Sequence, residues 1–306
     1  MCASRSCPAV VLGGHTAHAK GCLRLYRQTG HPCAGGGAYP AGVIISGNKI
    51  LVGGTCNDSS GAPRIVLQSI DANSGVAANP VVAATGTGAY AMLAVPGKIY
   101  VAGYKFSPTA GSSGSQPALK TPAILRFNGD GTLDSAFGSG GLVTKSFGNG
   151  DGLVTALSKS LDGRVAAVVS SSVESRLQIS VWAVSGSSVT TNDCSAEAQY
   201  PESIIPYAAQ RVGRDQLLVG GPVEANGSGL AITTFTLGVN STDCASAVVW
   251  NPAEGNRGFQ TFVADAEYDF IRAFALTTGQ KLLVAGPSYQ KSSSDRAISL
   301  ARFTVK

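Results

Sequence analysis

Charged side chains are scarce in this chain, and those that it has are scattered. Asp, Glu, Lys and Arg make up 13% of its 306 residues, whereas hydrophobic residues make up 44%. An intrinsically disordered chain shows the opposite balance, so the composition predicts a folded protein with a sizeable core. The 23 basic residues give a net charge of +5 but form no run and are not interleaved with aromatic residues. We therefore expect no nucleic-acid partner.

Long apolar segments are also missing. No apolar run approaches the ~18 residues that a membrane-spanning helix needs, so we expect no membrane span. No segment keeps the 3.6-residue apolar period of an amphipathic helix, which argues against a helical solenoid. No leader-like apolar segment directly follows Met1. We expect either a cytosolic chain or one from which a leader has been removed.

Glycine, by contrast, is abundant, with 39 residues, and together with many Val, Ile, Thr and Ser residues it predicts short strands joined by tight turns. One apolar motif recurs with some variation: a basic or polar residue, two or three aliphatic residues, then two small residues. Its six copies are AVVLGG (9–14), KILVGG (49–54), KIYVAG (98–103), RVAAVV (164–169), QLLVGG (216–221) and KLLVAG (281–286).

Each copy of this motif lies within a longer pattern of apolar segments. An apolar segment precedes five of the six copies across a short turn, another follows each copy after a polar loop, and a weaker fourth segment follows in places, as in GLVTKSF (141–147). Repeats of ~40–50 residues with four strands are typical of β-propeller blades. The sequence thus predicts one all-β domain over residues 1–306, a six-bladed β-propeller of four-stranded antiparallel blades.

The two ends of the chain fall in the middle of this pattern. The chain begins near the second strand of one blade and ends on the third strand of another, at ARFTVK. We expect one blade to be incomplete or to mix strands from both termini. A chain cut from a longer protein is the other explanation.

The unit at residues 123–170 carries the most specific signature. It reads AILRFNGDGTLDSAFGSGGLVTKSFGNGDGLVTALSKSLDGRVAAVVSS. It resembles the delta-60 repeat, a bacterial repeat, at Arg126, Asp130, Gly131, Leu133, Asp134, Phe137, Gly138, Gly141, Asp162 and Gly163. The resemblance implies a β-propeller, often in secreted or surface bacterial proteins and usually without an assigned activity. It transfers no catalytic residue.

The same unit contains a candidate calcium site. Asn128, Asp130 and Asp134 offer oxygen ligands at close spacing, as calcium loops do. The calcium loop of a helix–loop–helix unit also needs a ligand at its fifth position and a bidentate Glu at its twelfth, where this chain has Thr132 and Ser139. We favour the alternative, a turn rich in Asn, Asp and Gly that joins the third and fourth strands of a blade.

The three histidines form a second candidate metal site. His15, His18 and His31 lie close in sequence to Cys22 and Cys33, and His and Cys are ligands of zinc and copper. The three-residue spacing of the first two suits a helix, however, and glycine-rich surroundings fix no ligand geometry. We favour loop histidines here and expect no cofactor, with calcium and zinc as the alternatives.

Seven cysteines are many for a cytosolic chain without a C-x-x-C motif, so we expect an oxidising compartment and some disulfides. The odd count leaves at least one thiol free or paired outside the chain. Cys22 and Cys56 would lie at the same end of adjacent blades, where they could pair. The candidates are Cys2, Cys7, Cys22, Cys33, Cys56, Cys194 and Cys244.

Motifs of covalent catalysis are absent, since there is no G-x-S-x-G nucleophile elbow, and we assign no catalytic residue. We expect a non-catalytic binding or assembly module, secreted, periplasmic or on a bacterial cell surface. It would present long loops, of which residues 104–122 form the longest, to a protein or a surface glycan. Two alternatives stay open. One is a metal-dependent propeller hydrolase or lactonase. The other is a structural subunit whose open blade edge is completed by a strand from a partner.

Overall fold

The computed structural model describes the chain in fifteen stretches, and all of their regular structure is β-strand. The described residues are 36–107, 119–145, 151–159, 165–173, 176–184, 194–199, 207–212, 216–222, 230–237, 248–250, 259–262, 268–269, 273–277, 281–289 and 296–304. Among them, no helix is long and apolar enough to cross a membrane.

The strands form five antiparallel sheets, which we number along the chain. Sheet 1 contains β1 (Ala38–Ser46), β2 (Lys49–Asn57), β3 (Pro63–Asp71) and β4 (Val81–Thr85). Sheet 2 contains β5 (Thr87–Val95), β6 (Lys98–Ser107), β7 (Leu119–Asn128) and β8 (Leu142–Thr144). Sheet 3 contains β9 (Gly152–Lys159), β10 (Val165–Val173), β11 (Arg176–Val184) and β12 (Cys194–Gln199).

The last two sheets depart slightly from this plan. Sheet 4 contains β13 (Ala208–Val212), β14 (Gln216–Pro222), β15 (Leu230–Leu237), β16 (Val248–Trp250) and β17 (Phe259–Phe262), and both of the last two strands pair with β15. Sheet 5 contains β18 (Tyr268–Asp269), β19 (Ala273–Leu276), β20 (Lys281–Tyr289) and β21 (Arg296–Thr304), with β20 at its centre. Sheets 1 to 3 confirm the predicted four-strand meander, in which each strand pairs with the next along the chain.

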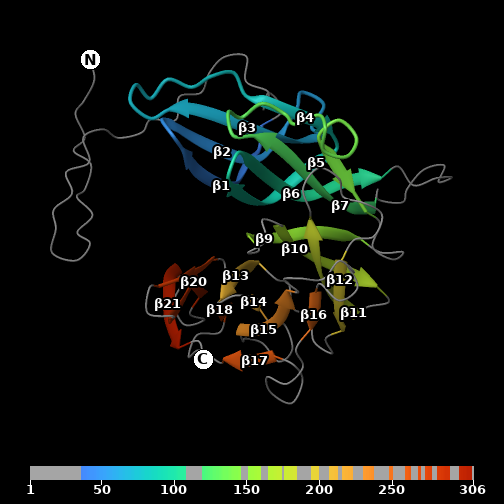
Figure 1. Cartoon of the computed structure of the whole chain (residues 1–306), viewed down its shortest axis with the longest axis vertical. Helices are drawn as coiled ribbons and strands as arrows, with labels where there is room; N and C mark the ends of the chain where they lie inside the picture. Colours follow the sequence, from blue (N-terminus) through green and yellow to red (C-terminus); the bar gives the residue numbers. More distant parts are fainter. Residues whose placement is uncertain are drawn as a thin grey trace.

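The sheets follow one another in an arc around a common centre (Figure 1). In sheets 1 to 4 the first strand contacts the first strand of the next sheet, and in sheet 5 the second strand, β19, takes this place. The strands β1, β5, β9, β13 and β19 therefore form the inner edge of the arc. This radial repetition of small antiparallel sheets is the architecture of a β-propeller. The repeat copy at 9–14 and the apolar segment at 22–28, which were expected to form another blade, lie outside the described residues.

The hydrophobic core lies between neighbouring sheets, not inside any one of them. Leu51, Ile65 and Leu67 of sheet 1 pack against Val101 and Phe127 of sheet 2 in one apolar cluster. Further clusters join sheet 2 to sheet 3 and sheet 4 to sheet 5. Both faces of a middle sheet are therefore buried, which explains why its central strands are nearly continuous apolar runs.

One predicted loop is shorter than the sequence suggested. Residues 104–122 were expected to form a loop, but β6 continues to Ser107 and β7 begins at Leu119. The ladder pairs Tyr104 with Pro122 and Ser107 with Leu119, because backbone pairing can continue past the end of the apolar run.

The first strands of sheets 1, 2 and 3 each carry a β-bulge at an equivalent position. The extra residues are Ala41 in β1, Tyr90 in β5 and Thr155 in β9, each opposite the small-residue end of the repeated motif or its equivalent. A bulge bends its strand and redirects the side chain of the extra residue.

Two glycines of the motif make room for this bent backbone. A Cβ atom added to Gly103 would collide with the carbonyl oxygen of Gly88, and one added to Gly54 would collide with that of Tyr39. The small residues of the repeat therefore permit the close strand approach that the sequence pattern indicated.

We predict that Gly103→Ala destabilises the protein by about 2–3 kcal/mol, because the new methyl group meets backbone that cannot move aside. Gly129→Ala is the matched control, since a Cβ there meets its nearest atoms at an ordinary 3.5 Å. It should change the stability by less than about 0.5 kcal/mol. Urea unfolding measures both, and equal effects of the two substitutions would contradict the account of the bulge.

Candidate functional site

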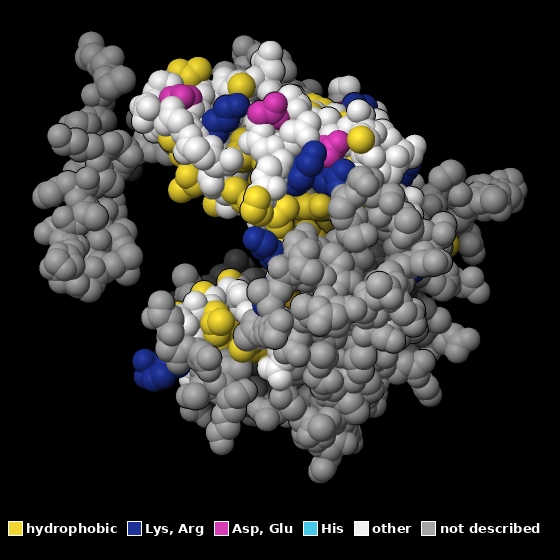
Figure 2. Space-filling model, viewed as in Figure 1, with side chains coloured by type: hydrophobic (Ala, Val, Ile, Leu, Met, Phe, Trp, Pro, Cys, Tyr) yellow, Lys and Arg dark blue, Asp and Glu magenta, His cyan; other side chains and the backbone are white. Residues whose placement is uncertain are grey.

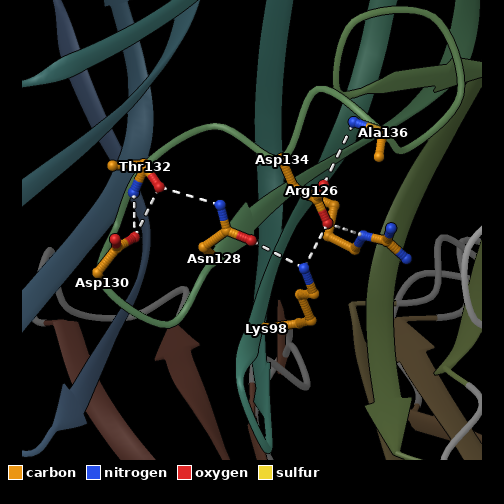
Figure 3. A network of polar contacts seen from close by, with 7 residues as sticks. All are labelled: Lys98, Arg126, Asn128, Asp130, Thr132, Asp134 and Ala136. Carbon is orange, nitrogen blue, oxygen red and sulfur yellow. Dashed lines mark hydrogen bonds and ion pairs between the residues drawn. The ribbon is translucent and has the colours of Figure 1, made fainter.

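The segment that joins β7 to β8 is organised around one buried carboxylate, that of Asp134. Its Oδ2 accepts a hydrogen bond from Lys98 Nζ at 2.6 Å and another from Arg126 Nε at 2.8 Å (Figure 3). Its Oδ1 accepts the backbone N–H of Ala136 at 3.3 Å. The hydrogen bond from Lys98, followed by the influence of Arg126, lowers the pKa of Asp134 below its ordinary value against the opposing effect of burial.

Arg126 links this ion pair to the apolar core. Its guanidinium lies 4.4 Å from the centre of the Phe137 ring, in cation–π geometry. Phe137 is fully buried and meets Tyr100 edge to face at 5.9 Å. The backbone closes the same unit, since Arg126 O accepts the N–H of Asp134. Three of the residues that carry the delta-60 resemblance, Arg126, Asp134 and Phe137, thus stabilise the connector together.

The other two candidate calcium ligands belong to the tight turn at the start of the connector. Asp130 Oδ1 accepts the backbone N–H of Thr132 at 2.9 Å and its hydroxyl at 2.7 Å. Asn128 accepts from Lys98 through Oδ1 and donates from Nδ2 to Thr132 Oγ1. Side chains that bond the backbone two residues on are typical of Asx turns.

The structure therefore brings Asn128, Asp130 and Asp134 into one network, but with different partners. Asp134 faces two cationic side chains, and a calcium ion beside it would be repelled by both. This geometry favours the turn over the calcium site. The segment lies between β7 and β8, so the prediction that it joins a third strand to a fourth is confirmed.

The remaining predicted site residues are mostly outside the described part of the chain. This holds for His15, His18 and His31 and for Cys2, Cys7, Cys22, Cys33 and Cys244. Cys56 is fully buried near the end of β2, and Cys194 begins β12. Disulfide pairing and a histidine metal site stay predictions. Within the described residues, no group of three His, Cys, Asp or Glu is placed to hold a metal ion.

A cavity lies where the first strands begin, at one end of the centre of the arc. Its volume is about 820 Å³, within the range of roughly 300–1,000 Å³ that is usual for small-ligand sites. Sheets 1, 2, 3 and 4 all contribute to its lining. The lining residues are Tyr39, Pro40, Ala41, Thr55, Asn57, Gly61, Pro63, Ala89, Tyr90, Tyr104, Phe106, Thr155 and Tyr207.

One repeated position supplies four of these residues. In each of sheets 1 to 4, one first-strand residue pairs with the first small residue of the repeated motif, or with the residue equivalent to it. The repeated position is the residue immediately before that first-strand residue. Three of these four residues are the bulge residues, and the fourth, immediately before β13, donates its backbone N–H to Gly220 O at 3.0 Å. They are Ala41, Tyr90, Thr155 and Tyr207. The same place in the strand register therefore contributes one cavity-lining residue in each of sheets 1 to 4.

Five of the residues that line the cavity are aromatic. The ring centre of Tyr104 lies 6.0 Å from that of Tyr90 and 5.1 Å from that of Phe106. Tyr39 and Tyr90 are 64% and 43% exposed, so their rings are open to a ligand. Burial, with a smaller contribution from Tyr90, raises the pKa of Tyr104 above its ordinary value, so its hydroxyl stays protonated at physiological pH.

The polar side of the cavity is held by bonds from sheet to sheet and by a rigid turn. Thr55 Oγ1 accepts the backbone N–H of Ala89 at 2.7 Å, which joins β2 to β5 at the cavity wall. Asp58 organises the neighbouring β2–β3 turn by accepting from Ser60 and Ala62, and it pairs with Arg64 at 2.8 Å. These hydrogen bonds lower the pKa of Asp58 to about 2. The rim is therefore largely formed before any ligand arrives.

Reasoning from the sequence missed this cavity. The available signal was a tyrosine near the start of three first strands, in AYPAG, GAYAM and PYAAQ. Without the register and the bulges, these tyrosines are indistinguishable from ordinary strand residues, since aromatic residues are common in strands.

We predict that Asp134→Asn lowers the free energy of unfolding by about 3 kcal/mol at pH 7, because two cations lose their charged partner. The folded-state pKa of Asp134 is depressed, so its contribution is present above its unfolded value of about 3.9 and is lost as the pH falls through the folded pKa. The stability gap between wild type and variant should narrow from pH 7 to pH 2. Urea unfolding across that range measures it.

The control for this prediction is Asp130→Asn, at an exposed turn, for which we expect a smaller loss at pH 7. A gap for Asp134→Asn that stays constant down to pH 2 would contradict the ion-pair explanation.

Comparison with known families agrees with the fold. A family model described as "Domain of unknown function (DUF5122) beta-propeller" matches residues 97–137, which cover β6, β7 and most of the connector with its Lys98, Arg126 and Asp134 network. No curated protein matches the chain. The match, the sheet order and the packing of sheet on sheet together support a β-propeller.

Proposed function

We propose that this protein is a non-catalytic binding module that holds a ligand in the aromatic cavity at the end of its central axis. The observation that carries the proposal is the convergence of Tyr39, Tyr90, Tyr104 and Tyr207 on one cavity from three different sheets. Concave sites lined by aromatic residues, with a few placed polar groups, are the usual form of a small-ligand site.

The chemistry of the wall favours binding over catalysis. The described lining offers phenol, hydroxyl and amide groups, in Thr55, Asn57 and the tyrosines, and neither carboxylate nor imidazole. General acid–base catalysis draws mostly on such groups, and metal-dependent hydrolysis needs them as ligands. We therefore place the metal-dependent propeller hydrolase or lactonase second.

An extracytoplasmic location is part of the same proposal. It rests on the number of cysteines and on the resemblance of residues 123–170 to the delta-60 repeat. We assign the repeats to that type because Arg126, Asp134 and Phe137 of the resemblance form one connected unit.

We further propose that the propeller has six blades and that the first 35 residues supply strands of the sixth. Sheet 1 presents exposed apolar side chains at one end of the arc, and sheet 5 presents an exposed leucine at the other. On sheet 1, Val43 and Ile45 are 65% and 78% exposed and point away from sheet 2, and on sheet 5 Leu300 is 70% exposed. Figure 2 shows apolar side chains gathered along the side of sheet 1 that looks across to sheet 5.

The expected occupant of this space follows from the sequence. The first 35 residues contain AVVLGG and CLRLYRQ, a copy of the repeated motif and of the strand that follows it. Apolar faces of this kind in soluble proteins mark contact sites. The alternative is a strand from a partner, which would make the chain a structural subunit.

We predict that small ligands found in a ligand-observed NMR screen lose their binding when Tyr90 and Tyr207 are both replaced by Ala. Both side chains line the cavity, and each comes from a different sheet. The screen should contain sugars, short peptides, nucleotides and carboxylic acids. Val76→Ala, at an exposed turn, is the control and should leave binding unchanged. Binding that survives the double substitution would place the site elsewhere, and turnover of ester or lactone substrates lost on chelation would support the hydrolase.

We predict that Ile45→Asp lowers the free energy of unfolding by about 2–4 kcal/mol, because a sixth blade would bury the new carboxylate without a partner. Val76→Asp, at a position that is also exposed, should change it by less than about 0.5 kcal/mol. Urea unfolding of the full chain measures both. A neutral Ile45→Asp would refute the six-blade proposal. A loss that depends on protein concentration would show that a second copy covers the face.

A further inference from the structure

We propose that the ligand of the aromatic cavity is a neutral glycan, bound by stacking of its pyranose rings on Tyr39 and Tyr90. This inference rests on the proposed function, since it names the class of ligand for the same site. It begins from what the cavity wall contains. Five of its described side chains are aromatic, three are polar and uncharged, and none is charged.

The absence of charge from the described wall disfavours ionic ligands. A carboxylate, phosphate or ammonium group entering the cavity would lose hydration without meeting an opposite charge on this wall. Lys120 is a cation close to the wall, since its Nζ lies 5.2 Å from the centre of the Tyr104 ring. That lysine already occupies cation–π geometry on the ring, and its charge repels a cationic ligand.

A fully apolar ligand fits the wall no better. The tyrosine hydroxyls and the amide of Asn57 border the same space, and an apolar ligand would cover them without offering hydrogen bonds. Tyrosine combines a flat apolar ring with a hydroxyl at its edge. A pyranose ring has the matching form, with a face of C–H groups and a rim of hydroxyls that both donate and accept.

The exposed rings are arranged for stacking. Tyr39 comes from β1 and Tyr90 from β5, so two neighbouring sheets each offer a ring. Tyr90 is fixed by the bulge and by its contact with Tyr104 at 6.0 Å between ring centres, which reduces the entropy lost on binding. The volume of the cavity, about 820 Å³, leaves room for more than one sugar unit.

A peptide added as an extra strand is less suited to this place. β1, β5 and β9 each have one free edge, but their bulges at Ala41, Tyr90 and Thr155 lie beside the cavity. A bulge interrupts the regular series of backbone donors and acceptors that strand addition requires. Peptide binding is accordingly an outcome that the test must separate from glycan binding.

The test is saturation-transfer NMR on the full chain with maltohexaose, cellohexaose, xylohexaose and mannohexaose as neutral probes. Oligogalacturonate serves as the charged probe and decaproline as the peptide probe. Concentrations up to about 10 mM detect complexes with Kd values in the millimolar range. We expect at least one neutral saccharide to bind, with transfer strongest to its ring C–H protons.

The variants separate stacking from hydrogen bonding. Tyr90→Ala should weaken the binding of that saccharide about tenfold, as the loss of a stacked ring does, whereas Tyr90→Phe should keep it within about threefold. Tyr39→Ala should also weaken it, and since Tyr39 is 64% exposed this variant keeps its fold. Val76→Ala is the control away from the cavity and should bind as the wild type does.

The other outcomes overturn different statements. Binding of decaproline or oligogalacturonate alone, lost in Tyr90→Ala, would refute the glycan and leave the cavity as the binding site. Saccharide binding that neither tyrosine substitution weakens would refute both the glycan inference and the cavity. Failure of every neutral saccharide to bind would refute the glycan inference.

Discussion

The bulge near the start of the first strand in sheets 1, 2 and 3 is the constraint on which the cavity depends. A strand that runs straight would keep its side chains perpendicular to the sheet, between neighbouring blades. The extra residues Ala41, Tyr90 and Thr155 break that alternation and turn one side chain toward the centre of the arc. The opposing strand tolerates the bend because it has a residue without a side chain there, as at Gly54 and Gly103. The apolar core and the cavity thus share the same strands, and they meet at the small side chains of Ala41 and Ala89.

The buried ion pairs and the cavity lie at opposite ends of sheet 2. At one end of sheet 2, the connector after β7 is fixed by Asp134, Lys98 and Arg126. At the other end, the starts of the first strands carry the aromatic rings of the cavity. Between them lie the apolar clusters that join sheet to sheet. The most specific sequence signature in the chain therefore marks the stabilising end, which explains why it indicates a fold and no activity.

The meander of short strands was predictable, because the repeated motif fixes where each second strand lies and strong turn residues flank it. The connector at 128–141 was predictable for the same reason, since Asn, Asp and Gly have strong turn preferences. The extension of β6 to Ser107 was not, because backbone pairing continued through polar residues. The cavity was not predictable either. It depends on a one-residue irregularity in register and on the meeting of four sheets, neither of which leaves a pattern within a single repeat.

The repeated cavity position has a consequence for how such a protein diversifies. Ala41, Tyr90, Thr155 and Tyr207 occupy one equivalent place in four successive blades, and each differs in size or polarity from its neighbour along the chain. Tyr90 and Tyr207 belong to none of the apolar clusters between the sheets, whereas Ala41 packs against the cluster of sheets 1 and 2. Exchange of the side chain at this place therefore disturbs the core least at the two tyrosines. The side chain at this position therefore varies from sheet to sheet in sheets 1 to 4, while its place in the register stays the same. A substitution at one of these positions changes the cavity wall at one sheet and leaves the register shared by the others in place.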